Sequence, residues 1–230
     1  MKRILITGAS RGIGRAIALR LAGPETTLIL TGRNQNDLNK TAAEAKSKGA
    51  SVIQLLCDLA DPNQVQALVM EASKAPLDVL INNAGVSHVK PVVEQSIEDW
   101  NDTIAVNITA PFLLCRGLIP VMSRGASIVN INSSAGRTGF GGWSSYCMSK
   151  FALDGFSKSI REELRAGGIR VISVFPSATD TEIWNDVPGN WPREQMMKPE
   201  SVADAVAGAL AQPPDVLIEE LVIGPIGGRL

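Results

Sequence analysis

The sequence contains few of the residues on which metal centres and disulfide scaffolds depend. Among its 230 residues there are one histidine and three cysteines. Cys57, Cys115 and Cys147 are odd in number and far apart, without the paired spacing of metal ligands, and are typical of small buried side chains in a reducing cytoplasm. A single histidine, His88, excludes a histidine-rich metal site. It leaves open the base of a Ser-His-Asp hydrolase, but we interpret His88 as a loop residue near the rim of a site.

The sequence also lacks any block of like charges. Its 22 Lys and Arg residues are scattered and nearly balance 23 Asp and Glu residues, so nothing suggests a nucleic-acid partner. No uninterrupted apolar run approaches the roughly 18 residues of a membrane span. Residues 1–7 turn polar too early for the apolar core of a signal peptide. We therefore expect a cytoplasmic protein with neither a membrane nor a nucleic-acid partner.

Short apolar runs alternate with helical patterns along the whole chain. The predicted strands are residues 3–7, 27–31, 51–56, 79–82, 126–132, 170–175 and 221–223. The predicted helices are residues 14–22, 37–48, 62–74, 97–123, 145–166 and 201–211. Several strands are almost uninterrupted Ile, Leu and Val, as in parallel strands covered on both faces. The pattern predicts one α/β domain over residues 1–230, a doubly wound Rossmann-type fold with a seven-stranded parallel sheet and helices on both faces.

A glycine-rich loop follows the first predicted strand. Residues 7–14 read Thr-Gly-Ala-Ser-Arg-Gly-Ile-Gly and lead into a helical apolar period. At such a helix N-terminus, free N–H groups and the helix dipole attract anions, and glycines let a pyrophosphate approach the backbone. Turns alone could explain a residue such as Gly12, but the position after the first strand of an alternating chain favours a dinucleotide site.

Further motifs follow this loop in order. They are Asp58 after the third strand, Asn82-Asn83-Ala84-Gly85 after the fourth, Asn107 in the long helix, Ser133 at the end of the fifth strand, and Tyr146-Cys147-Met148-Ser149-Lys150. With the glycine loop, this series resembles the short-chain dehydrogenase/reductase family over essentially the whole chain. The resemblance implies an oxidoreductase that transfers a hydride between a nicotinamide cofactor and a carbonyl/alcohol pair.

The last motif carries acid–base chemistry. Tyr146 and Lys150 are four residues apart in a predicted helix, so their tips share one face. The pKa of a phenol is about 10, and we expect the nearby ammonium to lower the pKa of Tyr146 toward working pH. Tyr146 is then expected to act as an acid in reduction and as a base in oxidation. Ser133, favoured over Ser134 by its spacing to Tyr146, is expected to donate a hydrogen bond to the same substrate oxygen. The resemblance implies that Lys150 also holds the nicotinamide ribose and that Asn107 supports a water that relays protons to Lys150.

Each of these four residues also has a purely structural interpretation. Tyr146 could pack a helix start, Lys150 could be a solvated helix lysine, Ser133 could be only a strand-end residue beside a functional Ser134, and Asn107 could cap or kink its helix. Because all of them fall in register with the glycine loop, we predict Asn107, Ser133, Tyr146 and Lys150 as the catalytic residues.

The predicted cofactor-binding set extends over several loops. It comprises Gly8, Ser10, Arg11, Gly12, Ile13, Gly14, Arg33, Asp58, Leu59, Asn82, Ala84, Gly85, Tyr146, Lys150, Pro176 and Thr181. By resemblance, Asp58 touches the adenine and Thr181 the carboxamide. Where the family usually has a glycine after Pro176, this chain has Ser177, and a Cβ there narrows the allowed backbone dihedrals.

The end of the second strand predicts which cofactor is used. Enzymes that bind NAD usually have an acid there for the ribose hydroxyls. Here the strand ends in Thr31-Gly32-Arg33-Asn34, and the first acid is Asp37, already at the next helix. Arg33 and Arg11 can together clamp a 2′-phosphate. We predict NADP, with NADPH preferred over NADH.

The segment 177–199 has no clear period, and a loop of this length in a compact domain is usually a functional lid. It contains Trp184, Trp191, Met196 and Met197, while Phe140 and Trp143 lie between Ser133 and Tyr146. These side chains suggest an apolar or aromatic substrate portion, or simply cover the sheet edge. Family activities leave open an acyl-thioester ketone, a small hydroxy acid, a steroid-like or aromatic ketone, and a sugar.

Three alternatives accompany the prediction of an NADP-linked reductase. They are an NAD-dependent alcohol dehydrogenase on the same fold, a dinucleotide-sensing protein without turnover, and a purely structural protein. A sensor is expected to lack Tyr146, Lys150 or Ser133, and a structural protein would not need the glycine loop. The resemblance also implies a homodimer or homotetramer, in which apolar residues on more than one face of helices 97–123 and 145–166 pack against their counterparts.

Overall fold

The computed structural model describes residues 1–228 and contains one seven-stranded sheet. The strands are β1 (Lys2–Thr7), β2 (Thr26–Gly32), β3 (Ser51–Leu56), β4 (Val79–Asn82), β5 (Ser127–Ile131), β6 (Arg170–Pro176) and β7 (Glu220–Ile223). Every neighbouring pair is parallel, in the order β3-β2-β1-β4-β5-β6-β7. The predicted Rossmann-type sheet is confirmed; residues 229 and 230 of the predicted domain lie outside the described residues.

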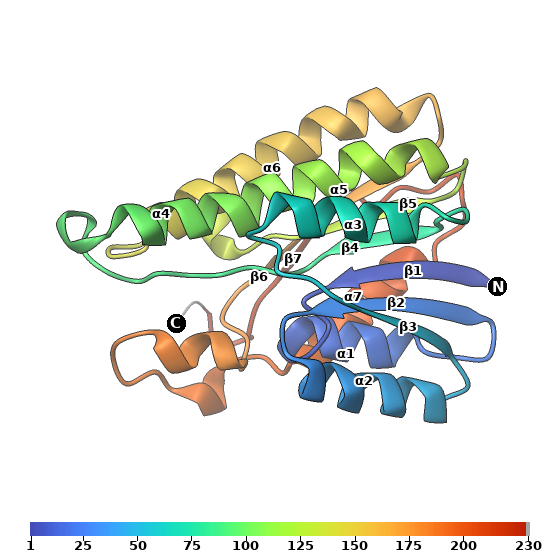
Figure 1. Cartoon of the computed structure of the whole chain (residues 1–230). Coiled ribbons are helices and arrows are strands. Elements are labelled where there is room, and N and C mark those ends of the chain that lie inside the picture. Colours follow the sequence, from blue (N-terminus) through green and yellow to red (C-terminus); the bar gives the residue numbers. More distant parts are fainter. Residues whose placement is uncertain (229–230) are drawn as a thin grey trace.

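Helices connect the strands and cover both faces of the sheet (Figure 1). They are α1 (Gly12–Leu21), α2 (Gln35–Ser47), α3 (Pro62–Ala72), α4 (Ile97–Ile104), α5 (Ala110–Leu118), α6 (Ser144–Arg165) and α7 (Pro199–Leu210). Short 3-10 helices occur at Val92–Glu94, Ile119–Val121, Ser134–Gly136, Glu182–Asp186 and Arg193–Gln195. Helices α3 to α6 lie on one face of the sheet, and α1, α2 and α7 lie on the other.

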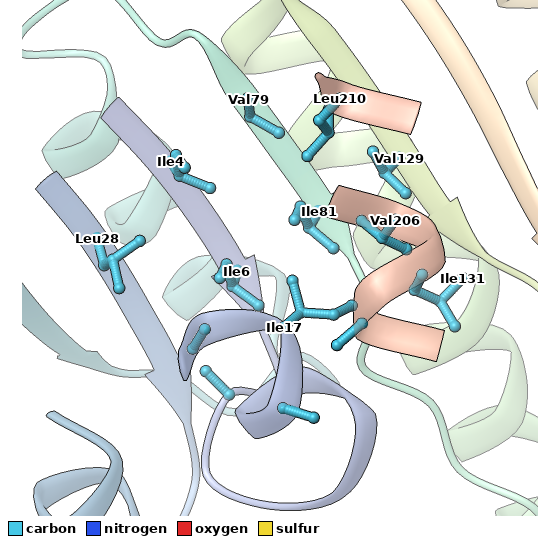
Figure 2. Packing of buried hydrophobic residues seen from close by; sticks show 14 of the residues in the cluster. Ile4, Ile6, Ile17, Leu28, Val79, Ile81, Val129, Ile131, Val206 and Leu210 are labelled. Atoms are coloured by element: carbon cyan, nitrogen blue, oxygen red, sulfur yellow. The ribbon is translucent and has the colours of Figure 1, made fainter. Parts of the chain in front are cut away.

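The alternation of side chains along each strand divides the core into two layers. Ile4 and Ile6 of β1 belong to the layer with α1 and α7, whereas Leu5 between them belongs to the layer with α3 and α5. Figure 2 shows the first layer, in which Ile17 of α1 and Val206 of α7 approach the strands. Each fully buried side chain of this size contributes roughly 1.5–3 kcal/mol, so these layers fix the strands that carry the site.

The predicted helix 97–123 is not one regular α-helix. Residues Ala105–Thr109 form a π-helical turn between α4 and α5, in which the Ala110 N–H donates to the carbonyl of Ala105. Pro111 is the physical reason, because it has no N–H to donate to the carbonyl of Asn107 and its ring would clash with that oxygen. Turns of this kind are frequent at functional sites, and this one carries Asn107.

The helical stretch Ile97–Val121, which includes this turn, is long and apolar enough to cross a membrane by length and composition alone. Its most apolar part is 39% buried inside the fold. Polar residues such as Asn107 and Arg116 interrupt the stretch, so it contains no uninterrupted apolar run of membrane-spanning length. Because Leu114 and Leu118 pack in the sheet layer with α3, we interpret the stretch as a core helix.

The sheet grows in opposite directions on the two sides of β1: β2 and β3 follow on one side, and β4 to β7 follow on the other. In parallel α/β sheets, ligands bind outside the carboxyl ends of the strands at such a switch point. Here the ends of β1 and β4 are joined, since the Asn83 and Ala84 N–H groups donate to Thr7 Oγ1 at 3.0 and 3.1 Å. The fold thus brings the glycine loop and residues 82–85 together.

Candidate active site

A cavity of about 600 Å³ opens at the carboxyl ends of the strands. It extends from the glycine loop, past the ends of β2 and β3, to the residues after β5 and β6. Its size and its position at the switch point are those of a site for a dinucleotide and a small substrate.

The glycine loop at one end of this cavity requires its glycines. Gly8 has a φ of 64°, and a Cβ there would come within 3.0 Å of the Ala84 Cα. A Cβ on Gly14 would overlap the carbonyl oxygen of Gly8. Asn83, which the sequence analysis did not select, donates through Nδ2 to the carbonyl oxygens of Thr7 at 2.9 Å and Gly8 at 3.3 Å. The loop is therefore held open against the end of β4, with α1 beginning at Gly12.

Two unpaired cations lie beside this loop. Arg11 and Arg33 both line the cavity and are exposed. Within residues 1–228, neither guanidinium has a hydrogen-bond or ion-pair partner. The nearest acid in sequence, Asp37, sits in the first turn of α2 and pairs with Lys40 at 2.8 Å. This end of the cavity can hold an anionic group with two guanidinium donors.

Tyr146 and Ser133 lie together at the other end of the cavity. Tyr146 is in the first turn of α6 and is 8% exposed, and Ser133 directly follows β5 and Asn132. Burial raises the pKa of Tyr146 to about 12, against which a hydrogen bond with the Ser133 side chain acts to lower it. The phenol therefore keeps its proton at neutral pH and is available as an acid.

Lys150 is buried one helical turn further along α6. Its Nζ donates to the carbonyl of Ile131 at 3.0 Å and lies 5.5 Å from the centroid of the Tyr146 ring. Burial lowers the pKa of Lys150 to about 8. The expectation that this ammonium brings the pKa of Tyr146 down is wrong for this structure, because Nζ is directed to Ile131 and burial disfavours both charged forms.

Asn107 projects from the π turn to a position behind the cavity wall. Its Oδ1 accepts from the Val86 N–H at 2.9 Å, and its Nδ2 donates to the Val86 carbonyl at 2.9 Å and to Ser149 Oγ at 3.0 Å. Ser149 in turn donates to the carbonyl of Tyr146 at 2.7 Å. A Cβ on Gly85 would contact both Asn107 Oδ1 and Lys150 Nζ, at 3.4 and 3.6 Å. Asn107 thus lies next to the Tyr146–Lys150 pair, and Ser149 is a link that the sequence analysis missed.

Comparison with known proteins identifies the family of this chain. Residues 2–190 match the family model described as short chain dehydrogenase. The chain belongs to the short-chain dehydrogenase/reductase family. It is an oxidoreductase, as the resemblance implied.

Two curated relatives of this dehydrogenase/reductase are named as reductases. A sepiapterin reductase of Chlorobaculum tepidum is 35% identical, covering 100% of this chain and 99% of the relative. A 3-oxoacyl-[acyl-carrier-protein] reductase of Escherichia coli is 35% identical, covering 79% of this chain and 75% of the relative. Among solved structures, an alcohol dehydrogenase from Thermococcus sibiricus complexed with 5-hydroxy-NADP gives a TM-score of 0.91 at 29% identity, covering 100% of this chain and 99% of that one.

Most of the residues predicted from the sequence line the cavity of this dehydrogenase/reductase. They are Gly8, Ser10, Arg11, Gly12, Ile13, Arg33, Asp58, Leu59, Ala84, Gly85, Ser133, Tyr146, Lys150, Pro176 and Thr181. Three others do not: Asn107 lies behind the wall, Gly14 supports the loop, and Asn82 points into the core. The Asn82 side chain donates to Asn130 Oδ1 at 2.8 Å, because residues 82 and 83 alternate about the strand end and only Asn83 faces the loop.

The unusual Ser177 is accommodated without strain. Within the described residues only glycines have positive φ, so Ser177 adopts an ordinary backbone conformation. Its N–H donates to the carbonyl of Ile223 at 2.8 Å, and Gly224 leaves space beside its hydroxyl. Nearby, the Thr181 side chain would touch a Cβ placed on Gly12, at 3.2 Å. The start of segment 177–199 therefore contacts the glycine loop across the cavity.

The aromatic and methionine residues near the substrate end separate into two groups. Phe140, Trp143, Trp184 and Trp191 line the cavity. Met196 and Met197, which the sequence analysis grouped with them, are buried and do not line it. Met197 instead packs in the core layer with α7. Its backbone forms a β-bridge with Thr179, which holds the two ends of segment 177–199 together.

Proposed function

We propose that this chain is an NADPH-dependent reductase of a carbonyl compound. The substrate is an apolar or aromatic ketone or aldehyde, or a 3-oxoacyl compound, and the whole chain acts as one catalytic domain. The observation that carries the proposal is that Tyr146, Ser133 and Lys150 converge in the cavity that the glycine loop and two unpaired arginines also line. NADPH, when bound, supplies the hydride that reduces the carbonyl carbon.

The cavity fits this cofactor in two respects. Gly8 and Gly14 allow the loop to pack closely where a Cβ would clash, and Gly12 and Ile13 at the N-terminus of α1 line the cavity, as a pyrophosphate site at a helix N-terminus requires. Arg11 and Arg33 are free to bind the 2′-phosphate. Several structurally similar proteins contain this cofactor, among them a short-chain dehydrogenase from Burkholderia cenocepacia in complex with NADP, which is 30% identical with a TM-score of 0.87 and covers 96% of both chains.

The protein residues then supply the proton and the orientation. Ser133 donates a hydrogen bond to the substrate oxygen and polarises the carbonyl. Tyr146 donates its proton to the same oxygen as the alkoxide develops, which converts the ketone to an alcohol. Lys150 is placed to hold the nicotinamide ribose, and Asn107 holds the proton relay that leads through Lys150 and restores the Tyr146 proton. Because burial raises the pKa of Tyr146, the free enzyme holds the proton that this step transfers.

The test is the oxidation of NADPH, followed by its absorbance, against a panel of neutral ketones and aldehydes near neutral pH. We expect turnover with at least one carbonyl, and a turnover of the same compounds that is about 10²–10⁴-fold slower in Tyr146→Phe. A protein that binds NADPH but oxidises it with no member of a broad panel would instead be a dinucleotide sensor. Faster turnover of alcohols with NAD would favour the alternative alcohol dehydrogenase.

A further inference from the structure

The substrate end of the cavity is lined by a continuous row of aromatic rings. Only 4% of this chain is aromatic, with four tryptophans in all, yet three of these line one cavity. The ring centroids of Tyr146 and Trp143 are 5.5 Å apart, and those of Trp143 and Trp184 are 5.8 Å apart. Those of Trp184 and Trp191 are 5.0 Å apart. The row thus leads from the acid Tyr146 out to the segment 177–199.

Two of the rings, those of Trp184 and Trp191, are oriented by hydrogen bonds within segment 177–199. Trp184 Nε1 donates to the carbonyl of Thr179, and Trp191 Nε1 donates to that of Pro188, both at 3.0 Å. Their N–H groups are therefore occupied, and what they offer a ligand is ring surface. Neighbouring rings are inclined by 54° to 63°, so none lies flat on the next, and all three indoles remain partly exposed.

The cations and most of the acids that line the cavity lie away from this row. Arg11, Arg33, Asp37 and Asp58 are at the glycine loop and the ends of β2 and β3. The Lys150 ammonium is buried and donates to Ile131. Of the charged residues within 1–228 that line the cavity, only the acid Glu182 lies in segment 177–199, so a substrate carboxylate would meet no lining cation in that segment. This disfavours the small hydroxy acids that the sequence left open.

We propose that the row formed by Trp143, Trp184 and Trp191 selects a neutral, planar aromatic ketone or aldehyde. Its carbonyl lies at Tyr146 and Ser133, and its ring lies against Trp143 and Trp184. The proposal rests on the proposed function and narrows its substrate class. Aromatic pairs contribute beyond the area they bury, by a factor of about 2 to 10 in affinity for each pair. A saturated ring of the same size receives the hydrophobic part of this gain but not the aromatic part.

The experiment compares two ketones that differ only in the ring, acetophenone and cyclohexyl methyl ketone. Calorimetry on the NADP⁺-loaded protein measures their dissociation constants without turnover. We expect acetophenone to bind about tenfold more tightly to the wild type. Trp184→Leu is expected to bring the two constants to within about twofold, while Trp184→Phe keeps most of the preference because a ring remains. Trp191→Leu should reduce the preference less, since this residue is farther from Tyr146 along the row.

Trp100 provides the matched control. It is the fourth tryptophan, lies on α4, is 39% exposed and does not line the cavity. Trp100→Leu should leave the preference unchanged. A wild type that binds the saturated ketone as tightly as acetophenone overturns the proposal, and so does a preference that survives both Trp184→Leu and Trp191→Leu.

Turnover of the same two ketones with NADPH separates this proposal from the proposed function. If both ketones bind with equal affinity and are reduced equally fast, the proposed reductase function is supported and the proposed selection of aromatic substrates is wrong. If acetophenone binds with the expected preference but is never reduced, the proposed aromatic selection is supported and the proposed reductase function is wrong.

Discussion

Burial controls the chemistry of individual residues in this site. Tyr146 and Lys150 share one face of α6, and burial moves their pKa values in opposite directions, to about 12 and about 8. In each case the neutral form is favoured, because charge is costly away from water. The phenol therefore carries its proton at neutral pH, while the ammonium is close to its own titration.

The first prediction concerns the proton donor. Tyr146→Phe keeps the ring and its packing on Trp143 but removes the transferable proton, so kcat should fall by about 10²–10⁴-fold. The affinity for NADPH should change little, because the arginines and the glycine loop remain. Steady-state kinetics together with fluorescence titration of NADPH check this; a loss in kcat below tenfold would remove Tyr146 from its role.

The second prediction concerns pH. Since burial lowers the pKa of Lys150 to about 8, the ammonium is present below that pH and is lost as the pH rises through it. We expect kcat/KM for reduction to decline above about pH 8. Lys150→Arg keeps a charge throughout this range, so its residual activity should lack the decline. An unchanged decline in that variant would assign the titration to another group.

The third prediction concerns cofactor choice. Charge-assisted hydrogen bonds contribute roughly 1.5–3 kcal/mol each, so Arg33→Ala should weaken NADPH binding about tenfold or more while leaving NADH nearly untouched. Arg20→Ala is a suitable control, because its partner is Asp204 at 2.6 Å and it does not line the cavity. Titration of both cofactors decides the matter, and equal wild-type affinity for NADH and NADPH would contradict the assignment.

At the scale of elements, two irregular segments supply what regular helices cannot. The π turn Ala105–Thr109 directs Asn107 toward Lys150. The segment 177–199 carries Trp184 and Trp191 to the cavity. It is fastened at its ends, where Arg193 donates to the carbonyl of Thr181 at 2.8 Å and pairs with Asp180 at 2.5 Å. We propose that the part between these anchors acts as a lid.

The fourth prediction tests that lid. Because Thr181 at its base meets the glycine loop, bound NADPH should stabilise the segment, and its amides should exchange hydrogen several-fold more slowly with the cofactor. Amides of the buried strand β5 should not change and serve as the internal reference. Equal protection with and without NADPH would mean that the segment is a fixed wall.

At the scale of the whole molecule, apolar side chains remain exposed on the helices of one face. Phe112 of α5 is 45% exposed and Phe151 of α6 is 48% exposed, and Phe112 packs edge-on against Phe156 at 6.2 Å. Helices that are apolar on their outer side as well as on their core side need a second partner. We propose that a second copy of the chain covers them, giving a homodimer or homotetramer.

The fifth prediction follows from this exposure. Light scattering at micromolar concentration should give a multiple of the chain mass. The double substitution Phe112→Glu and Phe151→Glu should shift the protein to the monomer, because it places charge in the proposed interface. Met70→Glu, at an exposed position on α3, should not. A monomeric wild type would exclude the assembly.

The sequence by itself determined the sheet, the glycine loop and the placement of Tyr146 and Lys150 on one face of a helix. Apolar runs in strands, a glycine loop before a helix and the spacing of Tyr146 and Lys150 are local patterns, and local patterns are enough when helical and strand geometry fix which side chains share a face. The same local information located Arg33 at the end of β2, where no acid competes for the phosphate.

Only the tertiary structure decided the features that depend on residues far apart in the chain. It turned Asn82 into the core and Asn83 toward the glycine loop, and it separated the tryptophans of the cavity from Met196 and Met197. It also reversed the expected shift of the Tyr146 pKa. Burial, hydrogen-bond partners and ring contacts are set by packing between distant segments, and no period or spacing along the sequence specifies them.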